Sequence, residues 1–154
     1  MWKVRDVMTP DPYAMRDSDD LYLARSIMQL GRIRHIPIVD EDNHFRGLVT
    51  HRDILEATVS KLAEVDHSTQ AELDASIPIE AIKRTDVKTV TPDTSLRDAA
   101  EILYKHKYGC LPVVEGEILV GILTEADFLK LTMQLMDSLD ADGSTEFTPT
   151  QRTP

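Results

Sequence analysis

The sequence predicts an α+β fold made of two similar halves, because one strand, turn, strand and helix pattern occurs twice in 154 residues. The first copy reads Ile36-Pro37-Ile38-Val39, then Gly47-Leu48-Val49-Thr50-His51-Arg52-Asp53. The second reads Leu111-Pro112-Val113-Val114, then Gly121-Ile122-Leu123-Thr124-Glu125-Ala126-Asp127. Pro112 follows Pro37 by 75 positions and Thr124 follows Thr50 by 74. We expect a bound ligand to lie between the halves.

Composition limits the class of protein. An apolar fraction of 42% with only 5% aromatic residues predicts an aliphatic core. A net charge of −10 argues against a general nucleic-acid or anionic-membrane binder, since both need basic surface. The single cysteine, Cys110, excludes an internal disulfide and fits a reducing compartment. With no long apolar run and no signal-peptide core at the N-terminus, we expect a soluble, cytoplasmic protein.

The first half is predicted element by element from its periodicity. Residues 3–9 form a short amphipathic turn, the prolines keep 9–12 extended, and 13–15 form a short strand. Ser18 is a good N-cap for a helix over 19–31, and Gly31 suits its end. A buried strand over 35–39 and a partner strand over 45–50 then form a hairpin. A helix runs from Thr50 to about Val65.

The second half repeats this order. Residues 79–84 stand where 4–9 stood, and 88–90 stand where 13–15 stood. Asp93 is the predicted N-cap of the next helix, and a shorter turn at Glu115-Gly116-Glu117 joins the second hairpin. The last helix runs from Thr124 to about Leu139. The predicted organisation is a first repeat over 1–65, a linker over 66–76, a second repeat over 77–140 and a flexible tail over 141–154.

Together these residues resemble a known module. Val4-x-x-Val7-Met8-Thr9, the helix with Leu21 and Ala24, and the two strands ending in Thr50-x-x-Asp53 resemble a CBS domain, named after cystathionine β-synthase. Residues 77–130 resemble a second one, so the chain resembles a CBS pair, or Bateman module. The resemblance implies two tandem β-α-β-β-α repeats, packed through their sheets with pseudo-twofold symmetry. It also implies further association into a homodimer.

The resemblance implies two clefts between the repeats for adenosine-containing ligands. In each cleft, the Thr-x-x-Asp of one repeat would bind the ribose and segments of the other repeat would enclose the base. The first cleft would combine Thr50, His51, Arg52, Asp53, Val87, Lys88, Tyr108, Gly109, Cys110, Leu111 and Pro112. The second would combine Thr9, Pro12, Tyr13, Ile33, Arg34, His35, Ile36, Pro37, Thr124, Glu125, Ala126 and Asp127.

The Thr-x-x-Asp spacing has two chemical interpretations. A carboxylate at the start of a helix can accept two adjacent sugar hydroxyls, and the helix N-terminus favours nearby phosphate oxygens. The same spacing is close to a capping box, in which Thr and Asp satisfy backbone N–H groups of the helix start. Both can hold at once. Its recurrence after a Gly-led strand in both halves, taken together with the resemblance, favours a ligand role for at least one of the two aspartates.

The residues inside the two motifs predict unequal clefts. His51, Arg52 and Lys88 place positive charge around Asp53, whereas Glu125 and Ala126 replace the first two in the other motif, with Arg34 and His35 opposite. A phosphate facing Glu125 would lose affinity. We therefore expect AMP, ADP or ATP to bind the Asp53 cleft more tightly. The Asp127 cleft is expected to be weaker, empty or suited to a less charged adenosine compound. Ordinary solvated surface is the alternative for the basic residues.

The sequence offers little other chemistry. The five histidines show no metal-ligand spacing, Cys110 reads as a small core residue, and no catalytic or phosphate-loop fingerprint is present. The prediction is a non-enzymatic regulatory module that senses an adenine nucleotide and signals by conformational change to an effector protein that the sequence does not identify. The alternatives are a structural or dimerisation module that binds no ligand, and an S-adenosylmethionine sensor.

Overall fold

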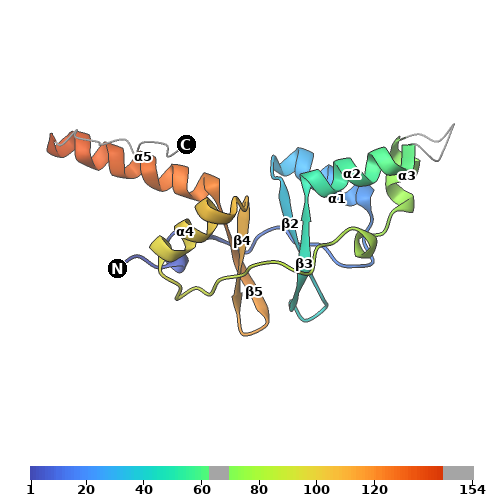
Figure 1. Cartoon of the computed structure of the whole chain (residues 1–154), viewed down its shortest axis with the longest axis horizontal. Coiled ribbons are helices and arrows are strands. Elements are labelled where there is room, and N and C mark those ends of the chain that lie inside the picture. Colours follow the sequence, from blue (N-terminus) through green and yellow to red (C-terminus); the bar gives the residue numbers. More distant parts are fainter. Residues whose placement is uncertain (63–69, 144–154) are drawn as a thin grey trace.

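Two β-hairpins stand side by side at the centre of the molecule, each with helices on its outer side (Figure 1). The computed structural model describes residues 1–62 and 70–143. In chain order the strands and α-helices are β1 (Thr9–Pro10), α1 (Leu21–Gly31), β2 (His35–Val39), β3 (Phe45–Thr50), α2 (His51–Leu62), α3 (Gln70–Ser76), α4 (Leu96–His106), β4 (Cys110–Glu115), β5 (Ile118–Thr124) and α5 (Glu125–Asp142). Short 3-10 helices over Val4–Asp6 and Ile79–Ala81 begin the two repeats. The predicted α+β class and the doubled pattern are confirmed.

The hairpins match the predicted strands closely. β2 pairs antiparallel with β3, with His35 opposite Thr50. β4 pairs antiparallel with β5, with Cys110 opposite Thr124. The shorter second turn is closed by Gly116 at φ 64°, a left-handed conformation that glycine adopts without steric cost. The two turns also touch, because Phe45 N donates to the Glu117 carbonyl at 2.8 Å.

Each half is completed by the start of the other repeat. The N-terminal segment crosses to the second half, where β1 pairs with β5 through Thr9 and Ile122. The segment after α3 crosses back, and Arg84 forms an antiparallel bridge with Leu48 of β3. The repeats are therefore consecutive along the chain but exchange their first segments in space. This exchange places Thr9 and Arg84 at matching positions in the two halves.

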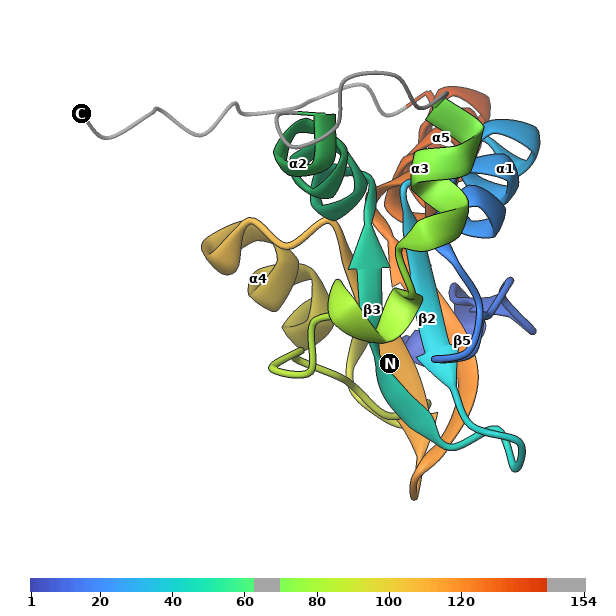
Figure 2. The same cartoon turned by 90° about the vertical axis from the view of Figure 1, so that its right-hand side faces the viewer.

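The hydrophobic core of each half includes residues from the exchanged segment of the other repeat. Figure 2 shows α1, α2 and α3 gathered around β2 and β3, and Ile77 and Ile79 complete the core of that half. Val4 lies in the core of the second half, with Leu111 and Leu123. These aliphatic clusters supply the main hydrophobic contribution to stability, at roughly 25 cal/mol per Å² of buried apolar area.

The glycines that precede the Thr-x-x-Asp motifs allow the close approach of the exchanged segments. A Cβ at Gly47 would lie 2.6 Å from the carbonyl oxygen of Arg84. A Cβ at Gly121 would lie 2.7 Å from Met8 Sδ and 3.0 Å from the carbonyl oxygen of Thr9. The absence of a side chain at both positions therefore allows the exchanged segments to pack closely on β3 and β5.

The helices α1 and α4 each begin two residues later than predicted. Ser18 and Asp93 are not the N-caps; Asp20 and Ser95 are, and each accepts from the backbone N–H three residues on, at 3.0 and 3.1 Å. A turn closed by a backbone hydrogen bond precedes each helix and delays its start. The sequence pattern identified the helices but not these turns. At the other end of α1, Arg32 rather than Gly31 adopts the left-handed cap conformation.

The connection between the halves contains a helix that the sequence analysis did not predict. α3 lies within the predicted linker over 66–76, and its Leu73 and Asp74 are buried. Arg25 Nε donates to Asp74 at 2.7 Å. The predicted end of the preceding helix at Val65 lies outside the described residues. The expected strand over 13–15 is reduced to one parallel bridge between Met15 and Ile38.

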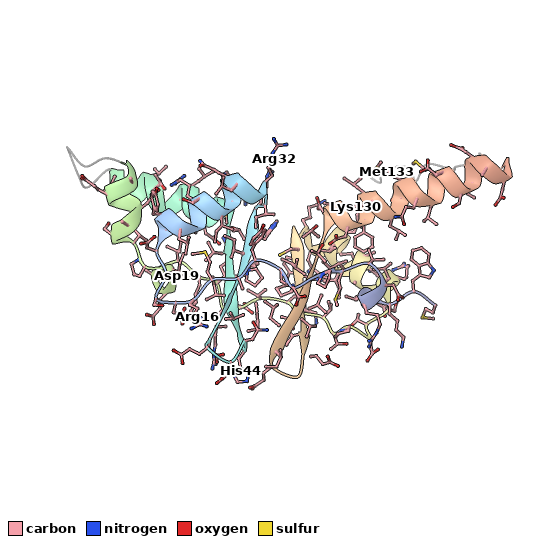
Figure 3. The ribbon with its side chains drawn as sticks, turned by 180° about the vertical axis from the view of Figure 1, so that it is seen from behind. Arg16, Asp19, Arg32, His44, Lys130 and Met133 are labelled. Carbon is pink, nitrogen blue, oxygen red and sulfur yellow. The ribbon has the colours of Figure 1, made fainter. Side chains whose placement is uncertain are left out.

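α5 extends away from the body of the molecule. It ends at Asp142, three residues beyond the predicted Leu139, so 141–142 are helical; 144–154 of the predicted tail lie outside the described residues. Figure 3 labels Lys130 and Met133 along the projecting part. Residues 132–142 are all exposed, including Met133, Leu135, Met136 and Leu139. Among the described residues, no helix has the length and apolar character needed to cross a bilayer.

Candidate functional site

Asp53 closes the first turn of α2 and is almost completely buried. Its Oδ2 accepts from Thr50 N and from Thr50 Oγ1, both at 2.9 Å. Asp53 N donates in return to Thr50 Oγ1 at 3.2 Å. This reciprocal pattern is a capping box, so the capping interpretation of the motif holds in the structure. A ligand role must use the parts of the carboxylate that capping leaves available.

Asp127 at the start of α5 repeats this geometry. Its Oδ2 accepts from Thr124 N at 2.9 Å and from Thr124 Oγ1 at 3.4 Å. It is 6% exposed, against 8% for Asp53. The backbone therefore presents the two aspartates in the same way, and any difference between the clefts must come from other side chains.

The remaining oxygen of each aspartate is held by the exchanged segment, and here the halves differ. Asp53 Oδ1 accepts from Arg84 Nε at 2.7 Å, which forms an ion pair. Asp127 Oδ1 accepts from the neutral hydroxyl of Thr9 at 2.9 Å. Arg84 was missing from the predicted first cleft. The repeat offset could have found it, because Thr9 was assigned to the second cleft and Arg84 lies 75 positions later.

Apolar residues join the halves beside the Asp53 side. Leu48, Cys110 and Ile122 form a small buried cluster, and Val87 packs against it. Burial raises the pKa of the Cys110 thiol to about 12, so it remains protonated and unreactive at neutral pH. Cys110 is thus a core residue, as predicted, and Val87 packs against the cluster that contains it.

His35 lies between the two motifs. Its ring fills the space above Gly109, where any Cβ would overlap it. Burial lowers the pKa of His35, and the nearby charge of Arg34 acts in the same direction, while Glu125 and Asp53 oppose it. The charges of Asp53 and Glu125, which were assigned to separate clefts, therefore both act on the His35 ring.

A basic cavity of about 310 Å³ opens between α1 and the start of α2. Arg34 and His51, which were assigned to different clefts, both line it, and His51 N donates to the Arg34 carbonyl at 2.8 Å. The full lining is Arg25, Met28, Gln29, Arg32, Ile33, Arg34, His51 and Ile54. Arg25 and Arg32 were not predicted site residues. Arg25 is already paired with Asp74, so the cavity offers an anion the guanidinium groups of Arg32 and Arg34 and the positive end of the α2 dipole.

The second half lacks this concentration of positive charge. At the positions that match Arg25, Arg32, Arg34 and His51, it carries Ala100, Lys107, Gly109 and Glu125. Asp127 instead lines a groove of about 320 Å³ on the N-terminal side of α5, together with Trp2, Asp6, Val7, Lys130, Leu131 and Gln134. Of the residues predicted to place positive charge around Asp53, His51 lines the basic cavity, and Arg34, predicted for the second cleft, lines it from the first repeat itself.

The other predicted site residues fall into two groups. Those whose side chains are buried are Ile36, Pro37, Leu111 and Pro112. Ile36 and Leu111 pack within the cores of their own halves, which leaves only their backbone for a cleft. Those that are exposed are Tyr13, Arg52, Lys88, Tyr108 and Ala126, whereas Pro12 is half-buried. Among the described residues, the side-chain hydrogen bonds and ion pairs of Asp53 are with Thr50 and Arg84, and not with Arg52 or Lys88.

One cluster outside these clefts resembles a metal site by composition. Ligand atoms of Asp40, Asp42 and His44 lie within 4.8 Å of one another in the first hairpin turn. Asp40 Oδ1, however, accepts from the backbone N–H of both Asp42 and His44 at 2.9 Å. The carboxylate therefore serves to close the turn.

Comparison with known proteins places this arrangement in a family. The chain is 29% identical over 136 residues to the uncharacterized protein MJ1404 of Methanocaldococcus jannaschii, covering 86% of this chain and 32% of that protein. The chain spans less than half the length of the first curated relatives it matches. A crystal structure of the Vibrio cholerae protein AcuB, named for acetoin utilization, is 35% identical with a TM-score of 0.79. The match covers 96% of this chain and 99% of the AcuB chain.

A second solved structure carries ligands. The CBS domain pair of protein MJ0100, in complex with 5′-methylthioadenosine and S-adenosyl-L-methionine, is 25% identical with a TM-score of 0.73, covering 88% of this chain and 98% of that chain. The CBS domain family itself matches residues 4–60 and 79–133 of this chain. Those ranges contain both hairpins, both Thr-x-x-Asp motifs and both exchanged segments. The chain therefore belongs to the CBS domain family and carries two CBS domains in tandem.

Proposed function

We propose that this protein is a regulatory module that binds an adenine nucleotide of the AMP, ADP or ATP class between its repeats and signals by conformational change. The observation that carries the proposal is the position of Asp53, a nearly buried carboxylate in the first turn of α2, a turn whose His51 and Ile54 line a cavity rich in arginine. The carboxylate suits the ribose hydroxyls and the cavity suits the phosphate. Cys110 and Val87 offer the adenine an apolar wall.

The two clefts are proposed to differ in ligand. Phosphate near the first motif would meet His51 and the arginines of the cavity, whereas phosphate near the second would meet the exposed Glu125. The Asp127 cleft is therefore weaker for nucleotides, or takes a less charged adenosine compound. The ligands of the MJ0100 pair support an S-adenosylmethionine-type ligand as the second candidate.

Signalling follows from the exchange of segments. A ligand that contacts Asp53 and Val87 touches both repeats, so it can fix the angle between them. It shifts that angle only if it binds two arrangements with different affinity. The protein thus acts as a sensor rather than a catalyst. We place it in the cytoplasm, where its free Cys110 thiol suits the reducing conditions, and an effector protein would read the change.

We also propose that two copies associate through the projecting part of α5. Met133 and Met136 are 64% and 57% exposed, and an isolated copy leaves this apolar face in water. Light scattering after size exclusion should report a dimer. Met133→Ser with Met136→Ser should shift the mass toward the monomer, while Gln134→Ser on the same helix should not. A monomeric wild-type protein would contradict this part of the proposal.

Native mass spectrometry of the freshly purified full chain tests the main proposal. We expect a co-purified mass of AMP, ADP or ATP, or its appearance when these are added. A thermal shift with the same nucleotides provides an independent measurement. No bound mass and no thermal shift with AMP, ADP, ATP or S-adenosylmethionine would favour a structural module that binds no ligand.

A further inference from the structure

The Asp53 carboxylate has little spare capacity to accept hydrogen bonds. Its Oδ2 accepts two bonds from Thr50 and its Oδ1 accepts one from Arg84 Nε at 2.7 Å. A carboxylate offers about four acceptor positions, so about one stays free. A ribose that donates both of its adjacent hydroxyls needs two. Binding of the diol to Asp53 must therefore displace one of the existing donors.

Arg84 is the donor that can leave. The Thr50 bonds cap α2 and are fixed by the local backbone, whereas the Arg84 side chain is 53% exposed and can move into solvent. The Arg84 backbone cannot move with it, because Arg84 N donates to the Leu48 carbonyl at 2.8 Å and Leu48 N donates to the Arg84 carbonyl at 2.9 Å. A displaced guanidinium therefore stays at the edge of the first cleft.

The second cleft has the same arrangement without the charge. Asp127 also accepts three bonds, and the third comes from Thr9, which pairs with β5 as Arg84 pairs with β3. A ribose that displaces the Thr9 hydroxyl breaks a bond between a neutral group and a carboxylate. A ribose that displaces Arg84 breaks an ion pair whose carboxylate is only 7% exposed. Ion pairs of this kind are stronger than neutral bonds.

We propose that Arg84 makes the first cleft selective for anionic ribosides, an inference that rests on the proposed nucleotide-binding function. A neutral nucleoside that takes Asp53 from Arg84 leaves the guanidinium without a counter-charge. A nucleotide brings its own phosphate, whose negative charge replaces that of Asp53. Arg84 thus competes with the ribose for Asp53. Once displaced, its guanidinium favours a ligand that carries a phosphate.

Calorimetric titration with AMP and adenosine tests this selectivity. All proteins carry Asp127→Asn, so that the first cleft dominates the signal. In Arg84→Thr, which copies the Thr9 arrangement, adenosine should bind more tightly and AMP more weakly. The ratio of the adenosine Kd to the AMP Kd should fall about tenfold, the factor that corresponds to one charge-assisted hydrogen bond.

The controls separate this effect from changes in net charge and folding. Arg97→Thr removes the same charge from the surface of α4, where Arg97 pairs with Glu101 at 2.6 Å, and should leave the ratio unchanged. Arg84→Gln keeps a donor for Asp53 without charge and replaces Arg84→Thr if that variant does not fold. The parent ratio retained in the folded Arg84 variant would overturn this inference alone. If wild type and parent bind neither ligand, the proposed function fails and the inference fails with it.

Discussion

The two aspartates that begin α2 and α5 share one backbone geometry but have different partners. Both are nearly buried, and both cap their helix through the preceding threonine. Asp53 is then paired with the charged Arg84, and Asp127 with the neutral Thr9. The repeat thus conserves the position of each carboxylate between its copies, while the exchanged segments decide its electrostatic surroundings. Differences in ligand preference should map to the exchanged segments rather than to the motifs.

Substitution of Gly47 and Gly121 by alanine tests whether the exchanged segments pack equally closely against the two hairpins. Gly47→Ala places a Cβ 2.6 Å from a backbone carbonyl oxygen that is fixed by two hydrogen bonds. Gly121→Ala mainly meets the flexible end of Met8. We expect losses of about 3 and about 1 kcal/mol in the free energy of unfolding, respectively, by the usual cost of overpacking. Urea unfolding at equilibrium measures both, and equal losses would show that the two approaches are equivalent.

Substitution of the N-caps of α1 and α4 tests a feature that the two halves should share. Asp20→Ala and Ser95→Ala each remove one bond to the first turn of α1 or α4, and each should cost about 1 kcal/mol. Ser18→Ala is the matched control, because Ser18 does not cap the helix, and it should change stability little. A loss in Ser18→Ala as large as in Asp20→Ala would contradict the observed helix start.

A smaller effect concerns pH, where the halves should differ. Burial lowers the pKa of His35 below its ordinary value of about 6.5, so the unfolded chain binds this proton more readily than the folded chain. The stability from neutral His35 is complete above about pH 6.5 and is lost as pH falls through the lowered pKa. Cys110, its counterpart in the second half, does not titrate in this range.

The check is chemical unfolding of wild type and His35→Asn over pH 5 to 7.5. The variant should lose part of the pH dependence, because asparagine has no proton to bind in this range. An identical pH dependence in the two proteins would show that His35 contributes no linkage.

The sequence was sufficient for the two hairpins, for helices α1, α2, α4 and α5 and for the position of both aspartates, because period and spacing record local geometry. It was insufficient where long-range contacts decide. Arg84 gave no local signal of its contact with Asp53, which depends on the exchange of segments. Arg34 was predicted for the second cleft, and the pairing of β2 with β3 also places it next to His51 of the first motif. The caps at Asp20 and Ser95 were missed because the preceding turns offered equally good capping residues at Ser18 and Asp93.

AMP titration of Asp53→Asn and Asp127→Asn, beside wild type, tests the central claim that the first cleft is the nucleotide site. Both variants keep a side chain of the same shape that can still cap the helix, so the comparison reports ligand contacts. We expect AMP affinity to fall about tenfold or more in Asp53→Asn, since a hydrogen bond to a charged group is lost, and to change little in Asp127→Asn. Equal losses in the two variants, or a larger loss in Asp127→Asn, would contradict it.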